Sequence, residues 1–97
     1  MTYSFHPEAR RELEQAIDYY EGRASGLGYE FSLEVHSAIQ RIADFPEAWE
    51  QMCPGIRRCM LKRFPYAVLY STDREHTYIL AVMHLHRRPG YWADRVD

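Results

Sequence analysis

The residues best suited to chemistry in this 97-residue chain gather near its end, in the stretch MHLHRRPGYWADR, residues 83–95. Imidazole, guanidinium and aromatic side chains follow an apolar run there: His84, His86, Arg87, Arg88, Tyr91, Trp92 and Arg95. Imidazole transfers protons near neutral pH, and guanidinium groups bind phosphate or carboxylate in two-point contacts. The stretch is therefore expected to belong to a surface that recognises another macromolecule.

The histidine pair has two competing interpretations. His84 and His86 are two residues apart, so in a strand they share one face. A zinc site needs three or four ligands at set spacing, and the other candidates are scattered. These candidates are His6, His36, His76, Cys53 and Cys59. We therefore predict no metal and no cofactor. A histidine near arginines keeps its neutral form and can accept a proton, but an ordinary hydrogen-bonded histidine at the rim of the core remains the alternative.

A second basic group lies in the segment 56–64. Strand alternation predicts Arg58 and Lys62 on one face of this segment, and Arg57 and Arg63 on the other. Together with the arginines near the C-terminus, they are expected to form one cationic patch that grips phosphates or stabilises charge on a phosphoryl group. For any single arginine, a solvated sheet edge protected by charge is the alternative. Trp92 is expected to pack in the core. No role is assigned to Tyr91 from the sequence.

Charge is divided unevenly along the chain, whose formal net charge is −2. Residues 1–55 hold four Arg and ten Asp or Glu, whereas residues 56–97 hold eight Lys or Arg and four Asp or Glu. The second half is thus the half expected to meet an anionic partner. The many carboxylates between Glu8 and Glu21 are interpreted as the solvated side of a helix. Two cysteines, no apolar run long enough to span a bilayer and no apparent signal peptide favour a cytoplasmic protein.

The elements that position these residues follow from periodicity. Apolar residues recur at helical spacing from about Pro7 to Glu21 and again from Phe31 to Ile42. Pro46 marks the end of the second predicted helix. The glycine-rich GRASGLG between them indicates an antiparallel helical hairpin. Strands are predicted at 2–5, 56–64, 66–72 and 77–85, and the last is apolar enough to be covered on both faces.

These elements predict one α+β domain spanning residues 1–97. Its two layers are an antiparallel sheet and an N-terminal helical hairpin that covers one face of the sheet. The order along the chain is β-α-α-β-β-β, and GYWADR adds a short C-terminal helical turn.

Four segments, in this order, resemble the RelE/ParE superfamily of toxins from bacterial type II toxin–antitoxin modules, also called plasmid stabilisation systems. The segments are FHPEARRELEQAIDYYE, LGYEFSLEVHSAIQRIADFPEAW, IRRCMLKRFPYAVLY and ILAVMHLHRRPGYWADR. The most specific parts are RFPY and the ending AV-x-H-x-x-R-x-P-x-x-W. The resemblance covers nearly the whole chain and implies the same fold.

The resemblance implies a cognate antitoxin as partner, in a heterotetramer or a larger complex, and one of two targets. A ParE-like toxin poisons DNA gyrase by binding it, and the sequence leans slightly this way. A RelE-like toxin cuts messenger RNA on the ribosome, with His84, Tyr91, Arg58 and Lys62 as candidate catalytic residues and Arg87 in a comparable place. A homologue that only binds its antitoxin is the third interpretation. The expected target- and antitoxin-binding residues are Arg57, Arg58, Arg63, His86, Arg87, Arg88, Trp92 and Arg95.

Overall fold

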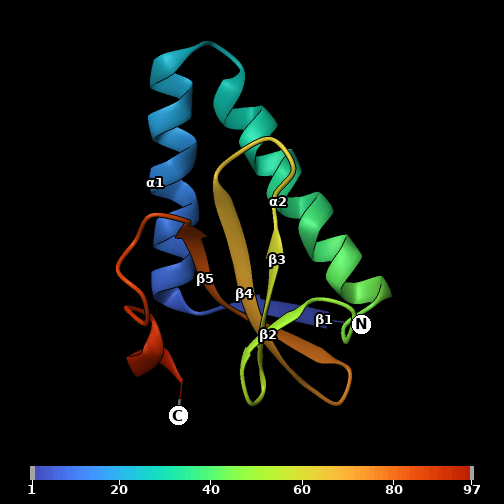
Figure 1. Cartoon of the computed structure of the whole chain (residues 1–97). Helices are drawn as coiled ribbons and strands as arrows, with labels where there is room; N and C mark the ends of the chain where they lie inside the picture. Colours follow the sequence, from blue (N-terminus) through green and yellow to red (C-terminus); the bar gives the residue numbers. More distant parts are fainter. Residues whose placement is uncertain (1, 97) are drawn as a thin grey trace.

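The computed structural model describes residues 2–96. Within them, two helices and a five-stranded sheet are followed by a short 3-10 turn (Figure 1). The bounds are Thr2–Phe5 for β1, Pro7–Arg23 for α1, Leu27–Asp44 for α2, Glu50–Cys53 for β2, Ile56–Met60 for β3, Tyr66–Asp73 for β4, His76–His84 for β5 and Ala93–Arg95 for the 3-10 turn. The predicted α+β class, the helical hairpin and the C-terminal turn are confirmed.

The strands lie in the order β1-β5-β4-β3-β2. The predicted antiparallel pairing holds from β5 to β3 and continues to an additional strand, β2, whereas β1 pairs with β5 in parallel, so the sheet is mixed. A parallel pair requires a long crossover connection, and the helical hairpin lies within the connection here. The strand β2 was not expected from the sequence. Its residues EQMC are all exposed, and it forms an edge of the sheet.

The helical hairpin forms where the sequence places it. Pro7 occupies the first turn of α1, and the His6 ring accepts a hydrogen bond from the Glu8 N–H at 3.0 Å, which caps the helix. The two helices approach closely at Gly28, whose N–H donates to the Glu21 carboxylate at 3.0 Å. A Cβ atom at Gly28 would lie 2.5 Å from the backbone oxygen of Ile17, so only glycine permits this contact.

Both faces of the sheet are covered. The helices bury one face in a core that contains Phe31, Val35, Ala38, Ile39, Ile42, Cys59, Val68, Tyr70, Ile79 and Val82. Residues after β5 cover the other face, where Trp92 packs in a second cluster with Ile56, Ala67, Leu69, Leu80, Ala81 and Met83. Trp92 is 8% exposed, so its predicted place in the core is confirmed. The continuous apolar run of β5 is explained by burial on both faces.

A β-bulge interrupts the pairing of β5 with β4. Ala81 lies opposite Leu69 and Ile79 lies opposite Tyr70, so Leu80 is the extra residue. A bulge leaves a residue outside the regular hydrogen-bond ladder, and its backbone groups then need other partners.

In residues 2–96, neither helix combines the length and the apolar character that crossing a membrane would require.

Candidate functional site

The carboxylate of Glu12, on α1, joins three parts of the molecule. Its Oε1 accepts hydrogen bonds from the Val82 N–H at 3.0 Å and from Arg95 Nη1 at 2.9 Å. Its Oε2 accepts from the Tyr91 hydroxyl at 2.6 Å and from Arg95 Nη2 at 3.0 Å. The side chains of Glu12 and Arg95 are only 13% and 10% exposed. Glu12 therefore ties α1, β5 and the C-terminal segment together through charge-assisted hydrogen bonds.

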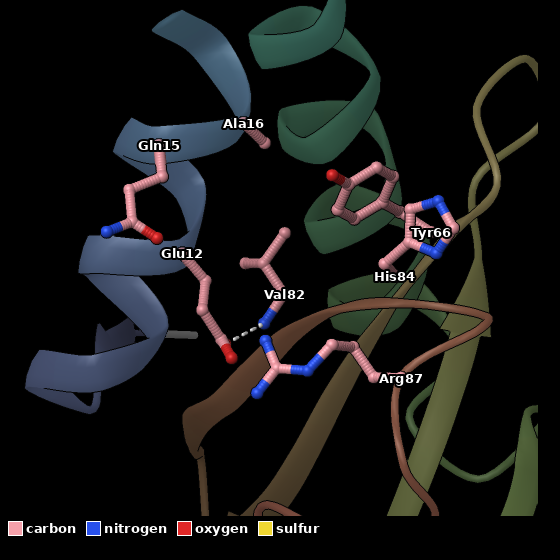
Figure 2. A pocket seen from close by; sticks show the side chains of 7 residues that line it. All are labelled: Glu12, Gln15, Ala16, Tyr66, Val82, His84 and Arg87. Atoms are coloured by element: carbon pink, nitrogen blue, oxygen red, sulfur yellow. Dashed lines mark hydrogen bonds between the residues drawn. The ribbon is translucent and has the colours of Figure 1, made fainter. Parts of the chain in front are cut away.

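We call the hydrogen bonds of Glu12 with Val82, Tyr91 and Arg95 the Glu12 clamp. The pairing of the strands explains why the clamp is needed. The pairing of β1 with β5 ends at Phe5 and Ile79, so no strand lies beside Val82 on that side. Glu12 accepts the Val82 N–H in place of a strand, as Figure 2 shows. The carbonyl oxygen of the bulged residue Leu80 likewise accepts a hydrogen bond from Arg95 Nη1 at 3.0 Å. The ion pair thus satisfies two backbone groups that the ladder leaves unpaired.

Tyr91 is held in the same network. Besides its bond to Glu12, its ring carries the Arg87 guanidinium 3.9 Å from the centroid and that of Arg95 at 5.0 Å. Burial, followed by the hydrogen bond to the Glu12 carboxylate, raises the pKa of Tyr91 well above that of free tyrosine. The phenol therefore stays protonated and engaged inside the molecule, which makes it a poor proton shuttle and a good anchor.

A small pocket of about 140 Å³ lies between α1 and the end of β5 (Figure 2). Gln15 and Glu12 line it from α1, while Tyr66, His84 and Arg87 line it from the sheet and the following turn. The His84 ring meets the Tyr66 ring edge-on, with centroids 5.0 Å apart. In Figure 2 the Arg87 side chain extends toward α1. The pocket combines a cation, an imidazole and an aromatic wall, which suits an anionic or aromatic group.

The two histidines of the pair stay close although β5 ends at His84. Their ring centroids are 5.3 Å apart, and the His86 N–H donates to His84 Nδ1 at 3.1 Å. In a neutral His84 ring the proton therefore lies on Nε2. Residues 2–96 contain no group of three or more His, Cys, Asp or Glu that could hold a metal ion.

The arginines do not form the single patch that the sequence predicted, and this expectation is wrong. Three of them are engaged in ion pairs: Arg58 with Glu50, Arg63 with Glu30 and Arg95 with Glu12. Arg57 donates to the Trp49 carbonyl at 2.8 Å. The partner carboxylates lie on β2, α2 and α1. The pair of Arg95 with Glu12 is largely buried, whereas Arg63 and Glu30 form a pair at the surface.

Lys62, Arg87 and Arg88 are the members of the expected patch that remain open. All three are exposed, and none forms an ion pair with a described residue of the chain. His86 beside Arg87 is also exposed. The turn after β5 therefore offers two neighbouring open arginines to a partner, and the Tyr91 ring lies against Arg87. Trp92 and Arg95 support this turn from inside rather than contact solvent.

The four candidate catalytic residues are not brought together. His84 follows Met83, which belongs to the second core, and therefore points to the helix side of the sheet. Arg58 precedes Cys59 of the helix-side core and therefore points to the opposite face. β3 ends at Met60, so the predicted strand alternation does not reach Lys62, whose N–H bonds Glu34 of α2 at 3.0 Å. Tyr91 is engaged by Glu12.

Glu12 is the residue that sequence reasoning missed, because the carboxylates of α1 were interpreted as solvated. A signal was present: Glu12 lies three residues after Ala9 and four before Ala16, which are the buried residues of this helix. That spacing places it at the edge of the buried stripe. The sequence could not show what it would meet there, because Tyr91 and Arg95 are about 80 positions away.

The fold is that of a small α+β domain in which a helical hairpin covers one face of a mixed sheet. Residues 3–89 match the family model described as the ParE toxin of type II toxin-antitoxin system, parDE, and the chain belongs to this family. The earlier resemblance to RelE/ParE superfamily toxins is thereby confirmed.

A solved structure described as the chromosomal ParDE TA system from P. aeruginosa has the same fold, with a TM-score of 0.62 and 15% sequence identity. The match covers 89% of this chain and 97% of the other. No curated protein sequence matches the chain significantly.

The raised pKa of Tyr91 predicts that the free energy of unfolding falls at alkaline pH. Its raised pKa, and that of Tyr70 at about 12, mean that the folded state holds protons that the unfolded chain releases near pH 10. The stabilisation is complete below pH 10 and is lost as the pH rises through the folded pKa values. Urea unfolding between pH 7 and 11 should show this decline.

The variant Tyr91→Phe tests the assignment. It should lower the free energy of unfolding by about 1–3 kcal/mol at pH 7, because a hydrogen bond to a charged group is lost. The alkaline decline should become shallower but persist, because Tyr70 still titrates. A decline identical to that of the unmodified protein would show that Tyr91 does not contribute to it.

Proposed function

We propose that this chain is a toxin that inhibits DNA gyrase by binding it and that a cognate antitoxin neutralises it. Membership of the ParE toxin family supports the toxin–antitoxin role. The observation that carries the choice of a binding mechanism is the placement of Arg58 and His84 on opposite faces of the sheet. Acid–base cleavage of RNA requires these groups around one phosphate, within hydrogen-bonding reach.

The charge distribution supports the same choice. A protein that works within ribosomal RNA gains affinity from many exposed cations. The net charge here is −2, and Arg58, Arg63 and Arg95 are already engaged by carboxylates. A limited contact through Arg87, Arg88 and His86 fits a protein target better. The site of action would be the cytoplasm, and the complex with the antitoxin would be a heterotetramer or larger.

Cleavage of ribosome-bound messenger RNA is a second candidate because part of a catalytic set does meet. His84 and Arg87 line one pocket, and Arg87 lies 3.9 Å from the centroid of the Tyr91 ring. This arrangement would bind a phosphate on the helix side of the sheet. It would have to work without Arg58 or Lys62 and with a phenol that Glu12 already engages.

Assays on the purified protein and on induced cells separate the two candidate functions. We expect purified protein to inhibit DNA supercoiling by gyrase in vitro, and induced cells to show DNA breaks before any cleavage of messenger RNA. Primer-extension mapping of transcripts provides the parallel measurement. Early cleavage within codons, with gyrase unaffected, would establish the nuclease instead. A protein that affects neither process but still binds its antitoxin would be a non-toxic homologue.

Two double variants test which basic residues are responsible for the inhibition of gyrase. Arg87→Gln with Arg88→Gln should weaken gyrase inhibition at least about tenfold, because two charged contacts at the interface are lost. Arg58→Gln with Lys62→Gln should change it less than about twofold. A nuclease that relied on Arg58 or Lys62 for charge stabilisation would instead lose about a hundredfold or more in the second variant.

A further inference from the structure

A pocket that the proposed function does not use lies at the end of the sheet where the β2–β3 and β4–β5 connections meet (Figure 1). Its volume is about 300 Å³, and its polar lining includes Glu47, Gln51, Arg57, Thr72 and Arg74. We call it the distal pocket. Arg74 precedes β5 and Arg87 follows it, so the nine residues of this strand, about 30 Å, separate the pocket from the turn proposed to meet gyrase.

The register of the strands builds this pocket. Gln51 lies opposite Arg57, and Arg57 lies opposite Tyr70, so the three side chains form one row across β2, β3 and β4. The row faces the helix side of the sheet, because Tyr70 belongs to the helix-side core. α2 ends at Asp44, and the chain after it is held over the row by the Tyr70 hydroxyl, which donates to the Pro46 carbonyl oxygen at 2.6 Å. Arg57 therefore lies between the core and the pocket.

Arg57 is a half-buried cation without a carboxylate partner. Its Nη1 donates to the Trp49 carbonyl oxygen at 2.8 Å, and its guanidinium forms no ion pair within residues 2–96. A cation that is partly removed from water loses hydration, and one neutral carbonyl does not compensate its charge. The remaining donors of the planar fork are arranged for a two-point contact with an oxyanion.

Arg74 brings a second cation to the same pocket. It is exposed in the turn between β4 and β5 and has no ion pair with a described residue. Its φ of 60° lies in the left-handed region, where glycine is less strained than any residue with a side chain. A ligand contact made by the guanidinium would offset this strain, as is common for strained residues at binding sites.

The rest of the lining defines the kind of anion that fits. Among the described residues of the pocket, two arginines and one carboxylate, that of Glu47, give a formal charge of +1. Glu47, Gln51 and Thr72 contribute a carboxylate, an amide and a hydroxyl group, which accept hydrogen bonds from hydroxyl groups of a ligand. Tyr70 is only 1% exposed and offers no ring face on which a nucleobase could stack. The volume suits a small molecule.

We infer that the distal pocket binds a small phosphate monoester of a sugar or of another polyhydroxyl compound. The phosphate lies between Arg57 and Arg74, and the hydroxyl groups bond to Glu47, Gln51 and Thr72. Such a ligand would connect the chain after α2 with the β4–β5 turn and would stabilise the folded protein by mass action. This inference does not depend on gyrase as the target.

Thermal unfolding of the full chain tests the inference, with ribose 5-phosphate, glucose 6-phosphate and glycerol 3-phosphate as probes at about 10 mM and constant ionic strength. For a Kd of about 2 mM, the melting temperature should rise by about 4–8 °C with at least one probe. Inorganic phosphate should give a smaller rise, because it lacks the hydroxyl contacts, and ribose should give none. Isothermal titration then measures the affinity of the best probe.

Two variants assign the binding to the arginines. Arg74→Gly removes one cation and relieves the backbone strain, so the free protein should melt about 3–8 °C higher while the affinity for the probe falls about fivefold or more. A purely structural role of Arg74 would not move the two quantities in opposite directions. Arg57→Lys keeps the charge but loses the planar fork, and should also weaken binding about fivefold or more. The matched control is Arg23→Gln, because Arg23 is an exposed arginine at the end of α1, and it should leave the affinity unchanged.

Three results would overturn the inference. The first is no rise in melting temperature with any of the three probes, and the second is an equal rise with inorganic phosphate, which would remove the role of the hydroxyl groups. The third is an affinity that stays unchanged in Arg74→Gly, a variant that is expected to fold at least as well as the unmodified protein. None of these results bears on the inhibition of gyrase, which is measured separately.

Discussion

Replacing Glu12 by alanine is expected to lower the free energy of unfolding by about 3–5 kcal/mol at pH 7, because it leaves a buried cation without its partner. Arg95 would keep a guanidinium that is only 10% exposed in the native protein, and the Val82 N–H would lose its acceptor. Small domains have total stabilities of about 5–15 kcal/mol, so the loss is a large fraction of the whole. Urea unfolding followed by far-ultraviolet circular dichroism measures it.

Glu14→Ala is the matched control. Glu14 lies on the same helix, is exposed and should cost less than about 0.5 kcal/mol when replaced. The double variant Glu12→Ala with Arg95→Ala should cost less than the sum of the two single changes, because it removes both charges of the pair. A cost below about 1 kcal/mol for Glu12→Ala alone would show that the network is not a structural clamp.

The second large effect is expected at the contact between the helices. In Gly28→Ala, the new methyl group would lie 2.5 Å from the Ile17 carbonyl oxygen and 2.9 Å from Glu21 Cβ. Neither neighbour can move without shifting α1 against α2, and overpacking of this kind costs about 2–3 kcal/mol. For a domain of this size, the melting temperature should fall by about 10–20 °C, as measured by calorimetry.

Gly22 provides the opposite case in the same hairpin. It lies within α1, and, apart from its chain neighbours and the adjoining backbone of the helix, no atom lies within 4 Å of the Cβ that alanine would add. Gly22→Ala should therefore stabilise the protein by about 0.5 kcal/mol, because alanine loses less backbone entropy in a helix. If both substitutions changed the melting temperature equally, the close approach of the helices at Gly28 would be refuted.

The Glu12 clamp relates the fold to the proposed activity. Arg87 and Arg88 lie in the turn that leads to Tyr91 and Arg95, and Glu12 anchors both of these residues by hydrogen bonds. A turn held in one conformation loses less entropy when a partner binds it. In the proposed function, Glu12 is thus a positioning residue, and the exposed arginines of the turn would make the contacts with the partner.

Local chemistry in the sequence was sufficient to predict most of the secondary structure. The helical spacing of apolar residues predicted α1 and α2, and the long apolar run predicted a central β5 with Trp92 in the core. Such patterns depend on neighbours within a few positions, and burial of one face follows from them directly. The strand β2 escaped prediction because EQMC has no such pattern and is a strand only through its pairing with β3.

The tertiary structure alone decided which charged groups remain available. An arginine has the same local signature whether it meets solvent or a carboxylate far along the chain, so composition suggested one cationic patch. Folding brought carboxylates of β2, α2 and α1 against Arg58, Arg63 and Arg95 and left Lys62, Arg87 and Arg88 open. Ion pairs between residues distant in sequence depend on packing geometry, which no local pattern encodes.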